Sequence, residues 1–293
     1  MRAGTTTLYQ ALRSHPSVYM APVKETNYFV MENGVPELPL DAAGTATLIA
    51  NSITSTAEYM ALFRAGADAV AIGEVSPSYL FSPGAPARIL DFLPHVRLIV
   101  ILRDPVDRAY SAYLRRAGVA PDPETFIQVA EREHEEFLSG RFTAHYPLLY
   151  GSMYSTHLEP YLRLFPGRLK IEVFETFWQD TRKSFAALHR YLGVPPITDA
   201  VPHLNRSGVP RFQSIDRVLR RGASVKRVIK QRLPPLAVRL LVDMKQSIEN
   251  WSLEGAEMLP PPVRSQLIER YFDREIETTE RLVGLDLSHW RGN

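Results

Sequence analysis

Hydrophobic residues of this chain gather in short runs that alternate with helical patterns. The clearest run is Val96–Leu102, which is nearly continuous in apolar residues and typical of a parallel strand covered on both faces. Residues 69–73 and 169–174 form two further runs, of which the first predicts another buried strand. Near the start, Leu8 and Leu12 share one face at helical spacing. Strands that alternate with loops and helices predict an α/β fold with a mostly parallel sheet.

Several helices can be placed from their patterns and stop signals. A helix over Thr181–Leu192 is closed by Gly193, a residue that suits the left-handed end of a helix. A helical pattern also covers Thr56–Arg64. Residues 119–142 are charged and helical, and the run Glu131–Glu136 predicts a solvated face. The 293-residue length suits a single domain, and we found neither an internal repeat nor a domain linker.

Residues 215–251 are unlike the rest of the chain, because nine Lys and Arg residues face only three acidic ones. Apolar residues interleave with the basic ones, and Pro234-Pro235 splits the segment into two helices. We interpret the segment as a basic helical insertion. It can lie on an anionic membrane surface, cover a substrate-binding site or shield its apolar face against the domain.

The amino-acid composition argues against several classes of function. With no cysteine, disulfides, thiolate catalysis and Cys-ligated zinc are excluded. The eight His residues form no metal-binding pair, so we expect no metal. A net charge of +2 is too mild for a nucleic-acid partner. No apolar run reaches the length of a membrane span and no signal peptide is recognisable, so a cytoplasmic location is expected.

The first residues combine a glycine and three hydroxyl residues with the start of a helix: Arg2-Ala3-Gly4-Thr5-Thr6-Thr7. A helix N-terminus offers unpaired N–H groups and a partial positive charge, so it is suited to bind an anion. The alternative is an ordinary helix capped by Thr. No Lys lies between a Gly and the Thr run, which argues against an ordinary P-loop kinase or ATPase.

A second candidate site follows the strand Val96–Leu102. Arg103 lies at its carboxyl end, where open α/β sheets bind ligands. Asp104 or Pro105 can start the next helix, and Ser111 lies about two turns along it. Arg103 and Ser111 can therefore face the same pocket.

Together these segments resemble the sulfotransferases that use 3′-phosphoadenosine 5′-phosphosulfate (PAPS), and most closely their bacterial and heparan-sulfate-type members. The resemblance also includes His15-Pro16 and the motif Pro22-Val23-Lys24-Glu25-Thr26-Asn27-Tyr28-Phe29. It covers most of the chain in order, except for about 30–68 and 212–255. It implies a three-layer, P-loop-like α/β fold. Because such loops follow a strand and Met1 immediately precedes this one, we expect the first strand to be missing.

The resemblance assigns the cofactor-binding residues. The loop, Arg2 to Thr7, would hold the 5′-phosphosulfate, with Arg2 where the family usually has Lys. Arg103 and Ser111 match its 3′-phosphate site. Asn205, Ser207 and Arg211, in the segment His203–Arg211, match a late loop that closes over the nucleotide, although an ordinary polar turn is the alternative there.

The candidate catalytic residues are Glu25, Arg2 and Lys24. In the related enzymes a Glu at this motif position removes the acceptor's proton, and Glu25 matches it. The adjacent rings of Tyr28 and Phe29 are expected to raise its pKa, as apolar surroundings do. A surface Lys-Glu pair is the alternative interpretation.

Candidate acceptor-binding residues are Glu74, Tyr79 and Tyr154. Glu74 and Tyr79 belong to a segment similar to one beside the family's acceptor cleft, and Glu74 is a second candidate base or orienting residue. Its alternative role is a structural hydrogen-bond partner, and core packing is the alternative for Tyr154. Val75 stands where heparan-type enzymes often have Lys, which speaks against a polysaccharide acceptor.

The sequence thus predicts transfer of a sulfuryl group from PAPS to a hydroxyl or amine of a small molecule, lipid or carbohydrate. A nucleotide kinase of related fold is one alternative. A catalytically inactive homologue, acting as a nucleotide-binding or membrane-surface module, is another. Acceptor identity and oligomeric state stay open.

Overall fold

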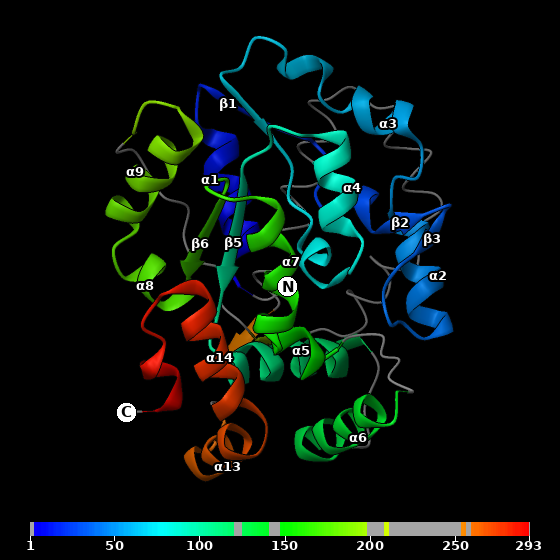
Figure 1. The fold of residues 1–293 in the computed structure, drawn as a ribbon, viewed down its shortest axis with the longest axis vertical. Coiled ribbons are helices and arrows are strands. Elements are labelled where there is room, and N and C mark those ends of the chain that lie inside the picture. Colours follow the sequence, from blue (N-terminus) through cyan, green and yellow to red (C-terminus); the bar gives the residue numbers. More distant parts are fainter. Residues whose placement is uncertain are drawn as a thin grey trace.

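The computed structural model describes residues 3–119, 125–140, 147–197, 208–210, 253–255 and 259–292 (Figure 1). For 116–119, 208–210 and 253–255 it describes the backbone alone. Several candidates named above lie outside the described residues: Arg2, Asn205, Ser207, Arg211 and the basic segment 215–251.

Strands are paired two by two. The parallel pairs are β1 (Val18–Met20) with β4 (Ala71–Gly73), and β5 (Leu98–Leu102) with β6 (Leu169–Val173). The antiparallel pairs are β2 (Met31–Glu32) with β3 (Val35–Pro36), and β7 (Gly208–Pro210) with β8 (Leu253–Gly255). The strands predicted at 96–102 and 169–174 are therefore confirmed, and they are direct parallel neighbours.

Helices surround the parallel strands. They are α1 (Thr5–Ser14), α2 (Ala42–Asn51), α3 (Thr56–Ala61), α4 (Ala85–Phe92), α5 (Pro105–Val119), α6 (Phe126–Leu138), α7 (Tyr154–Leu164), α8 (Phe174–Gln179), α9 (Thr181–Leu192), α13 (Pro261–Leu267) and α14 (Asp273–Val283). A π-helix, η5 (Ile268–Phe272), joins the last two. Short 3-10 helices are η1 (Tyr28–Val30), η2 (Arg64–Gly66), η3 (Pro77–Phe81), η4 (Tyr150–Ser152) and η6 (Ser288–Arg291).

The central strand β5 separates two hydrophobic cores. Leu102 packs in the core that includes residues of α5, α6, α7 and α14. Its neighbour Ile101 packs in the core formed with α1, β1 and α9. Successive strand residues point to opposite faces, so β5 carries one core on each side. The layers follow from this: α1, α8 and α9 lie on one side of β5 and β6, and α5, α7 and α14 on the other (Figure 1).

Local signals correctly placed the helix ends. α9 spans the predicted residues, and Gly193 follows it with φ 79°. α5 begins at Pro105, and the Asp104 carboxylate accepts the Asp107 N–H at 2.9 Å. Both ends obey the capping chemistry that predicted them.

Two predictions about burial were wrong. Val70 and Ile72, expected in a buried strand, are 66% and 47% exposed. Val70 precedes β4, and Ala71 packs against the core, so its neighbour Ile72 points to the opposite face. Glu133, expected on a solvated face, is buried, because it accepts the backbone N–H groups of Leu148 and Tyr150, each at 2.8 Å. A charged run can therefore contain a buried residue when the adjoining chain supplies donors.

Candidate functional site

The loop at the start of α1 is shaped by Gly4. This residue occupies the capping position before the helix, with φ 75° and ψ 10°, so the helix is not capped by a Thr side chain. The left-handed region favours glycine, which carries no Cβ. Thr5 and Thr6 are half-buried, whereas Thr7 and Ala3 are buried. The exposed part of the N-terminal turn is thus formed by Gly4, Thr5 and Thr6.

Two aromatic residues of α8 press against Gly4. A Cβ built on Gly4 would lie 2.8 Å from the Trp178 Nε1 atom and 3.1 Å from the Phe174 ring. The Trp178 Nε1 atom is buried and has no hydrogen-bond partner among the described residues. A buried donor thus faces the loop beside the free N–H groups of α1, an arrangement that suits an anionic ligand.

Arg103 connects this loop to the end of β5. Its guanidinium carbon lies 5.0 Å from the centroid of the same Phe174 ring that contacts Gly4. One guanidinium nitrogen is 3.6 Å from the Asp107 carboxylate. The Arg103 side chain is 16% exposed, and its backbone carbonyl accepts the Tyr154 hydroxyl at 2.7 Å. The Gly4 loop and Arg103 therefore share one edge of the parallel strands.

Ser111 and Tyr154 are more deeply buried than Arg103. Ser111 is 3% exposed on α5, and β7 runs beside that helix. Tyr154 is also 3% exposed, and its ring packs near Trp290. Burial raises the pKa of Tyr154 despite the nearby Arg108 guanidinium, so its hydroxyl stays protonated and donates to Arg103. Tyr154 therefore packs in the hydrophobic core, which was the alternative to a role in the acceptor cleft.

The turn after Arg103 is held by the C-terminal part of the chain. The Arg264 guanidinium pairs with the Asp104 carboxylate and lies 2.9 Å from that of Asp107. The Glu175 carboxylate accepts the Asp104 N–H at 3.0 Å and the Trp290 indole N–H at 3.2 Å. Burial raises the pKa of Asp104, and the Arg264 contact offsets only part of that rise. These partners come from α8, α13 and η6, so three distant segments support the β5–α5 turn.

Lys24 and Glu25 form a close ion pair after β1. The Lys24 ammonium donates to the Glu25 carboxylate at 2.6 Å, and the two side chains are 21% and 43% exposed. Burial by itself would raise the pKa of Glu25, but the Lys24 charge and hydrogen bond lower it below its ordinary value. The predicted raised pKa was wrong, because the Tyr28 ring stacks on Tyr59, 4.3 Å between centroids, and Phe29 is buried.

Glu74 follows β4, beside the residues that follow β1. Its carboxylate accepts hydroxyl protons from Thr26 at 3.0 Å, from Ser76 at 2.7 Å and from Tyr79. Burial raises the pKa of Glu74, and the hydroxyl contacts counter this only in part. We refer to Glu74, Thr26, Ser76 and Tyr79 as the hydroxyl cage.

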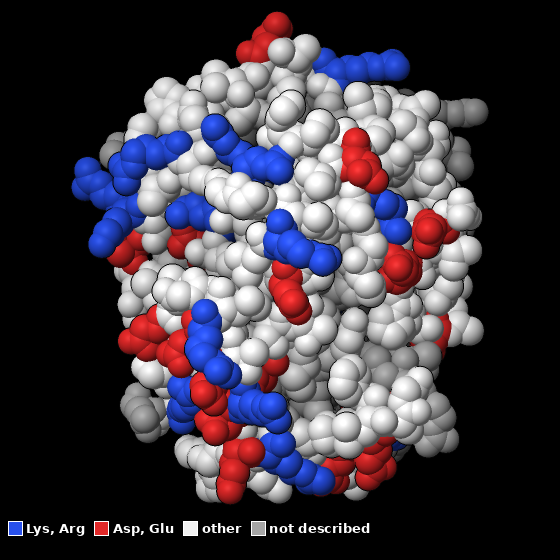
Figure 2. Space-filling model, in the orientation of Figure 1, with Lys and Arg blue, Asp and Glu red and all other residues white. Residues whose placement is uncertain are grey.

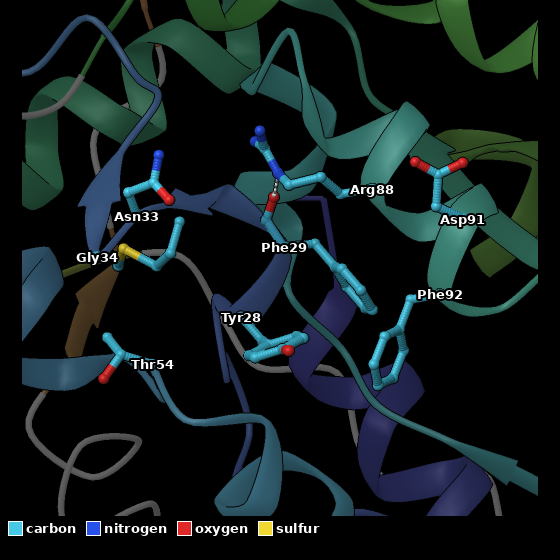
Figure 3. Close-up of a pocket in the computed structure, with 9 residues that line it drawn as sticks. Tyr28, Phe29, Asn33, Gly34, Thr54, Arg88, Asp91 and Phe92 are labelled. Atoms are coloured by element: carbon cyan, nitrogen blue, oxygen red, sulfur yellow. Dashed lines mark hydrogen bonds between the residues drawn. The ribbon is translucent and has the colours of Figure 1, made fainter.

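A pocket of about 410 Å³ lies beyond the aromatic residues that follow Glu25 (Figure 3). Tyr28, Phe29 and Phe92 line it, together with Arg88 and Asp91 from α4. The Arg88 guanidinium is engaged with the Phe29 carbonyl at 2.8 Å and the Glu37 carboxylate at 2.8 Å. The pocket therefore presents mainly rings and neutral groups.

Charges on the described surface are mixed. In the face shown by Figure 2, acidic and basic side chains are interspersed, most densely over α13 and α14. Pairs such as Arg291–Asp273 at 3.0 Å account for part of this pattern. Among the described residues, no cluster of three or more His, Asp or Glu side chains is placed to hold a metal. Within the same residues, no helix is long and apolar enough to cross a membrane.

The structure brings most of the described candidates to one edge. Glu25, Glu74, Arg103 and the Gly4 loop all follow or adjoin the carboxyl ends of parallel strands. Sequence reasoning missed Phe174 and Trp178, although an aromatic cluster directly after a strand could have signalled them. It also missed Arg264, for which the sequence carries no recognisable signal.

The fold and this edge define an α/β protein in which a helix N-terminus suited to an anion lies beside an arginine. A family model described as "Sulfotransferase family" matches residues 1–199. The chain therefore belongs to the sulfotransferase family.

Solved and curated relatives agree with this assignment. The crystal structure of a sulfotransferase from Alicyclobacillus acidocaldarius superposes with a TM-score of 0.71 at 25% identity, covering 99% of this chain and 95% of that one. Mouse heparan sulfate glucosamine 3-O-sulfotransferase 3B1 is 32% identical over 136 residues, 46% of this chain. Human bifunctional heparan sulfate N-deacetylase/N-sulfotransferase 2 is 32% identical over 128 residues, 42% of this chain. The matches span 34% and 14% of those two relatives.

Proposed function

We propose that this protein transfers a sulfuryl group from PAPS to a hydroxyl or amine of its acceptor. The observation that carries the proposal is the Phe174 ring, which contacts both Gly4 and Arg103. It joins a loop suited to a phosphosulfate to an arginine suited to a second phosphate. Two anion sites on one strand edge match the two charged ends of this nucleotide.

The residues present fit such a nucleotide. Gly4 leaves the N-terminal turn of α1 open, and the buried Trp178 indole N–H adds a donor beside it. Thr5 and Thr6 would add hydroxyl donors, and Arg103 and Ser111 would hold the 3′-phosphate. Arg2, Asn205, Ser207 and Arg211 are proposed from the family resemblance alone.

The nucleotide supplies an activated sulfuryl group, and the chain supplies positioning, charge and a base. As the bond from sulfur to the acceptor forms, the bond from sulfur to the bridging phosphate oxygen breaks. The acceptor proton passes to the Glu25 carboxylate. The lowered pKa of Glu25 keeps that carboxylate ionised near neutral pH. Lys24, 2.6 Å from Glu25, orients it and adds positive charge at the site.

Further properties of the protein are proposed from the sequence. We propose a single domain over residues 1–293, a cytoplasmic location, no nucleic-acid partner and peripheral membrane contact through 215–251. Tyr79 and Glu74 border the acceptor side. The missing Lys at Val75 and the mainly neutral pocket of Figure 3 favour an acceptor without dense negative charge over a heparan-like chain.

Calorimetry tests the nucleotide. Adenosine 3′,5′-bisphosphate, the desulfated product, is expected to bind with micromolar affinity, whereas ADP, the control without a 3′-phosphate, is expected not to bind. Binding of ADP alone would favour a nucleotide kinase, and binding of neither would reject the proposal for this chain.

A further inference from the structure

The backbone around Glu25 has an unusual conformation. Glu25 and Asn27 have φ of 61° and 51°, and Asn33 is the other non-glycine residue with positive φ among those described. Asn tolerates this region through its short polar side chain, but Glu has no such preference. The conformation at Glu25 therefore requires restraint from outside the turn.

The segment after β4 supplies that restraint. The Glu25 N–H donates to the Val75 carbonyl at 2.8 Å, and the Asn27 N–H donates to the Ser76 hydroxyl at 3.1 Å. The Ser78 hydroxyl holds the Asn27 side chain at 2.5 Å. The Asn27 amide closes the turn by donating to the Glu25 carbonyl at 2.9 Å. Both the N–H and the carbonyl group of Glu25 are therefore engaged in hydrogen bonds.

Glu74 sets the direction of these hydrogen bonds. A serine hydroxyl has one proton, and Ser76 gives it to Glu74 at 2.7 Å, which leaves a lone pair for the Asn27 N–H. Thr26, between the two left-handed residues, gives its proton to Glu74 at 3.0 Å. Thr26 is 0% exposed, so this contact fixes the middle of the turn in the interior.

The turn in its left-handed form determines where the Glu25 carboxylate lies. In an extended chain, adjacent side chains point to opposite faces. Lys24 and Glu25 are adjacent, yet their charged groups are 2.6 Å apart. The left-handed φ at Glu25 brings them to the same side, so the ion pair depends on the restrained backbone.

We infer that Glu74 is a positioning residue, which acts through Ser76 and Thr26 to hold Glu25 and Lys24 in their paired arrangement. Both Glu74 oxygens already accept protons from this chain, Oε1 from Thr26 and Tyr79 and Oε2 from Ser76. These contacts make Glu74 an orienting residue for the base. The inference rests on the proposed function for the importance of Glu25, but not for the contacts themselves.

Carbon-13 NMR titration of the Glu25 carboxyl group tests the inference. In Glu74→Gln an amide NH₂ replaces one accepting oxygen, and in Ser76→Ala and Thr26→Val one donor is lost. Each variant is expected to raise the Glu25 pKa toward the ordinary value of about 4.3, because the Lys24 contact loosens. Ser76→Thr, which keeps the hydroxyl, is expected to preserve the wild-type titration.

Glu37→Gln is the matched control. Glu37 is also a partly buried carboxylate, accepting from Arg88 at 2.8 Å and from the Gly84 N–H at 2.9 Å, but it belongs to a different cluster. It is expected to leave the Glu25 titration unchanged. A merely structural role for Glu74 would lower the melting temperature without moving the Glu25 pKa.

Two measurements separate this inference from the proposed function. Affinity for adenosine 3′,5′-bisphosphate is expected to change less than twofold in the Ser76 and Thr26 variants. If the wild type does not bind this nucleotide but the Glu25 pKa responds as described, the sulfuryl-transfer proposal fails and the positioning role stands. An unchanged Glu25 pKa in folded Ser76→Ala and Thr26→Val overturns the positioning role, whether or not Glu74→Gln folds.

Discussion

Two polar clusters of this protein, the hydroxyl cage and the pair Arg108 and Glu133, use different groups to satisfy their charges. The hydroxyl cage surrounds the Glu74 carboxylate with side-chain hydroxyls. The second cluster, Arg108 and Glu133, is completed by main-chain groups: Arg108 donates to the Pro147 and Leu148 carbonyls, and Glu133 accepts N–H groups of Leu148 and Tyr150.

The two clusters differ in what they restrain. Pro147, Leu148 and Tyr150, whose backbone groups bind Arg108 or Glu133, have no positive φ, so that cluster fixes an unstrained stretch of backbone before α7. The cage holds a turn with two left-handed non-glycine residues that presents a half-exposed carboxylate. The cage therefore restrains a strained turn beside an exposed charged group, which is the feature that connects it with the proposed function, whereas the second cluster supports an unstrained backbone.

The largest expected effect is the loss of turnover when Glu25, the proposed base, is replaced. Glu25→Gln keeps the shape of the side chain but removes its ability to accept a proton. Turnover is expected to fall about 10²–10⁴-fold, the usual contribution of a general base, while affinity for adenosine 3′,5′-bisphosphate is retained. Release of that product from PAPS measures turnover with any acceptor found by screening.

A turnover rate in Glu25→Gln within threefold of the wild type would contradict the assignment of the base. Glu131→Gln, whose carboxylate pairs with Arg270 at 2.5 Å, is the control and is expected to keep the wild-type rate.

The Arg108 cluster is expected to respond in stability instead. Arg108 is 3% exposed, and replacing it by Met would leave the Ser152 hydroxyl and two carbonyls without its guanidinium. We expect a loss of about 3–5 kcal/mol in the free energy of unfolding. Urea denaturation measures it.

Arg132→Met provides the contrast. Arg132 forms a partly exposed pair with Glu136 at 3.5 Å, and its loss should cost about 0.5 kcal/mol or less. Similar costs for the two variants would show that the Arg108 cluster does not hold the fold.

Local patterns predicted much of the fold and only part of the site. The start of α5, the span of α9 and the strand β5 follow from residues close together in sequence. Arg103 was recognisable because it follows a predicted strand, and Lys24 and Glu25 were recognisable from the family motif.

The remainder depends on contacts between distant residues. Thr26 reaches Glu74 and Tyr79, which are 48 and 53 positions away, and no local pattern specifies such partners. The pKa of Glu25 was predicted in the wrong direction because the sequence does not show which of its neighbours contacts the carboxylate. The rings beside it in sequence turn toward Tyr59 and the core, and the group that decides its charge is Lys24.

A third prediction concerns the loop before α1 and compares two left-handed glycines. Gly4→Ala would add strain at φ 75° and a contact of 2.8 Å with the Trp178 Nε1 atom. We expect a loss of about 2–4 kcal/mol in stability from strain and overpacking together, with weaker nucleotide binding.

Gly34→Ala is the matched control, because Gly34 has φ 80° and nothing within 4 Å of an added Cβ. It should lose only about 1 kcal/mol through strain, with nucleotide affinity unchanged. Thermal unfolding measures stability and calorimetry measures nucleotide affinity. Equal losses in Gly4→Ala and Gly34→Ala would show that the contact with α8 is unimportant.

The smallest expected effect is a pH dependence that belongs to the cage. Burial raises the pKa of Glu74, so the folded state holds its proton more tightly than the unfolded chain does. This contribution to stability is fully present below the unfolded pKa of about 4.3 and is lost as pH rises through the folded value. Glu74→Gln cannot titrate, and Glu133 titrates in both proteins and cancels in the difference. Because Glu74→Gln is expected to move the Glu25 pKa, both proteins also carry Glu25→Gln. The unfolding free energy of the protein that keeps Glu74 should therefore fall relative to that of its Glu74→Gln partner above about pH 4.3, by at most about 1.4 kcal/mol per pH unit, and a constant difference from pH 4 to 8 would show that burial does not disfavour the Glu74 charge.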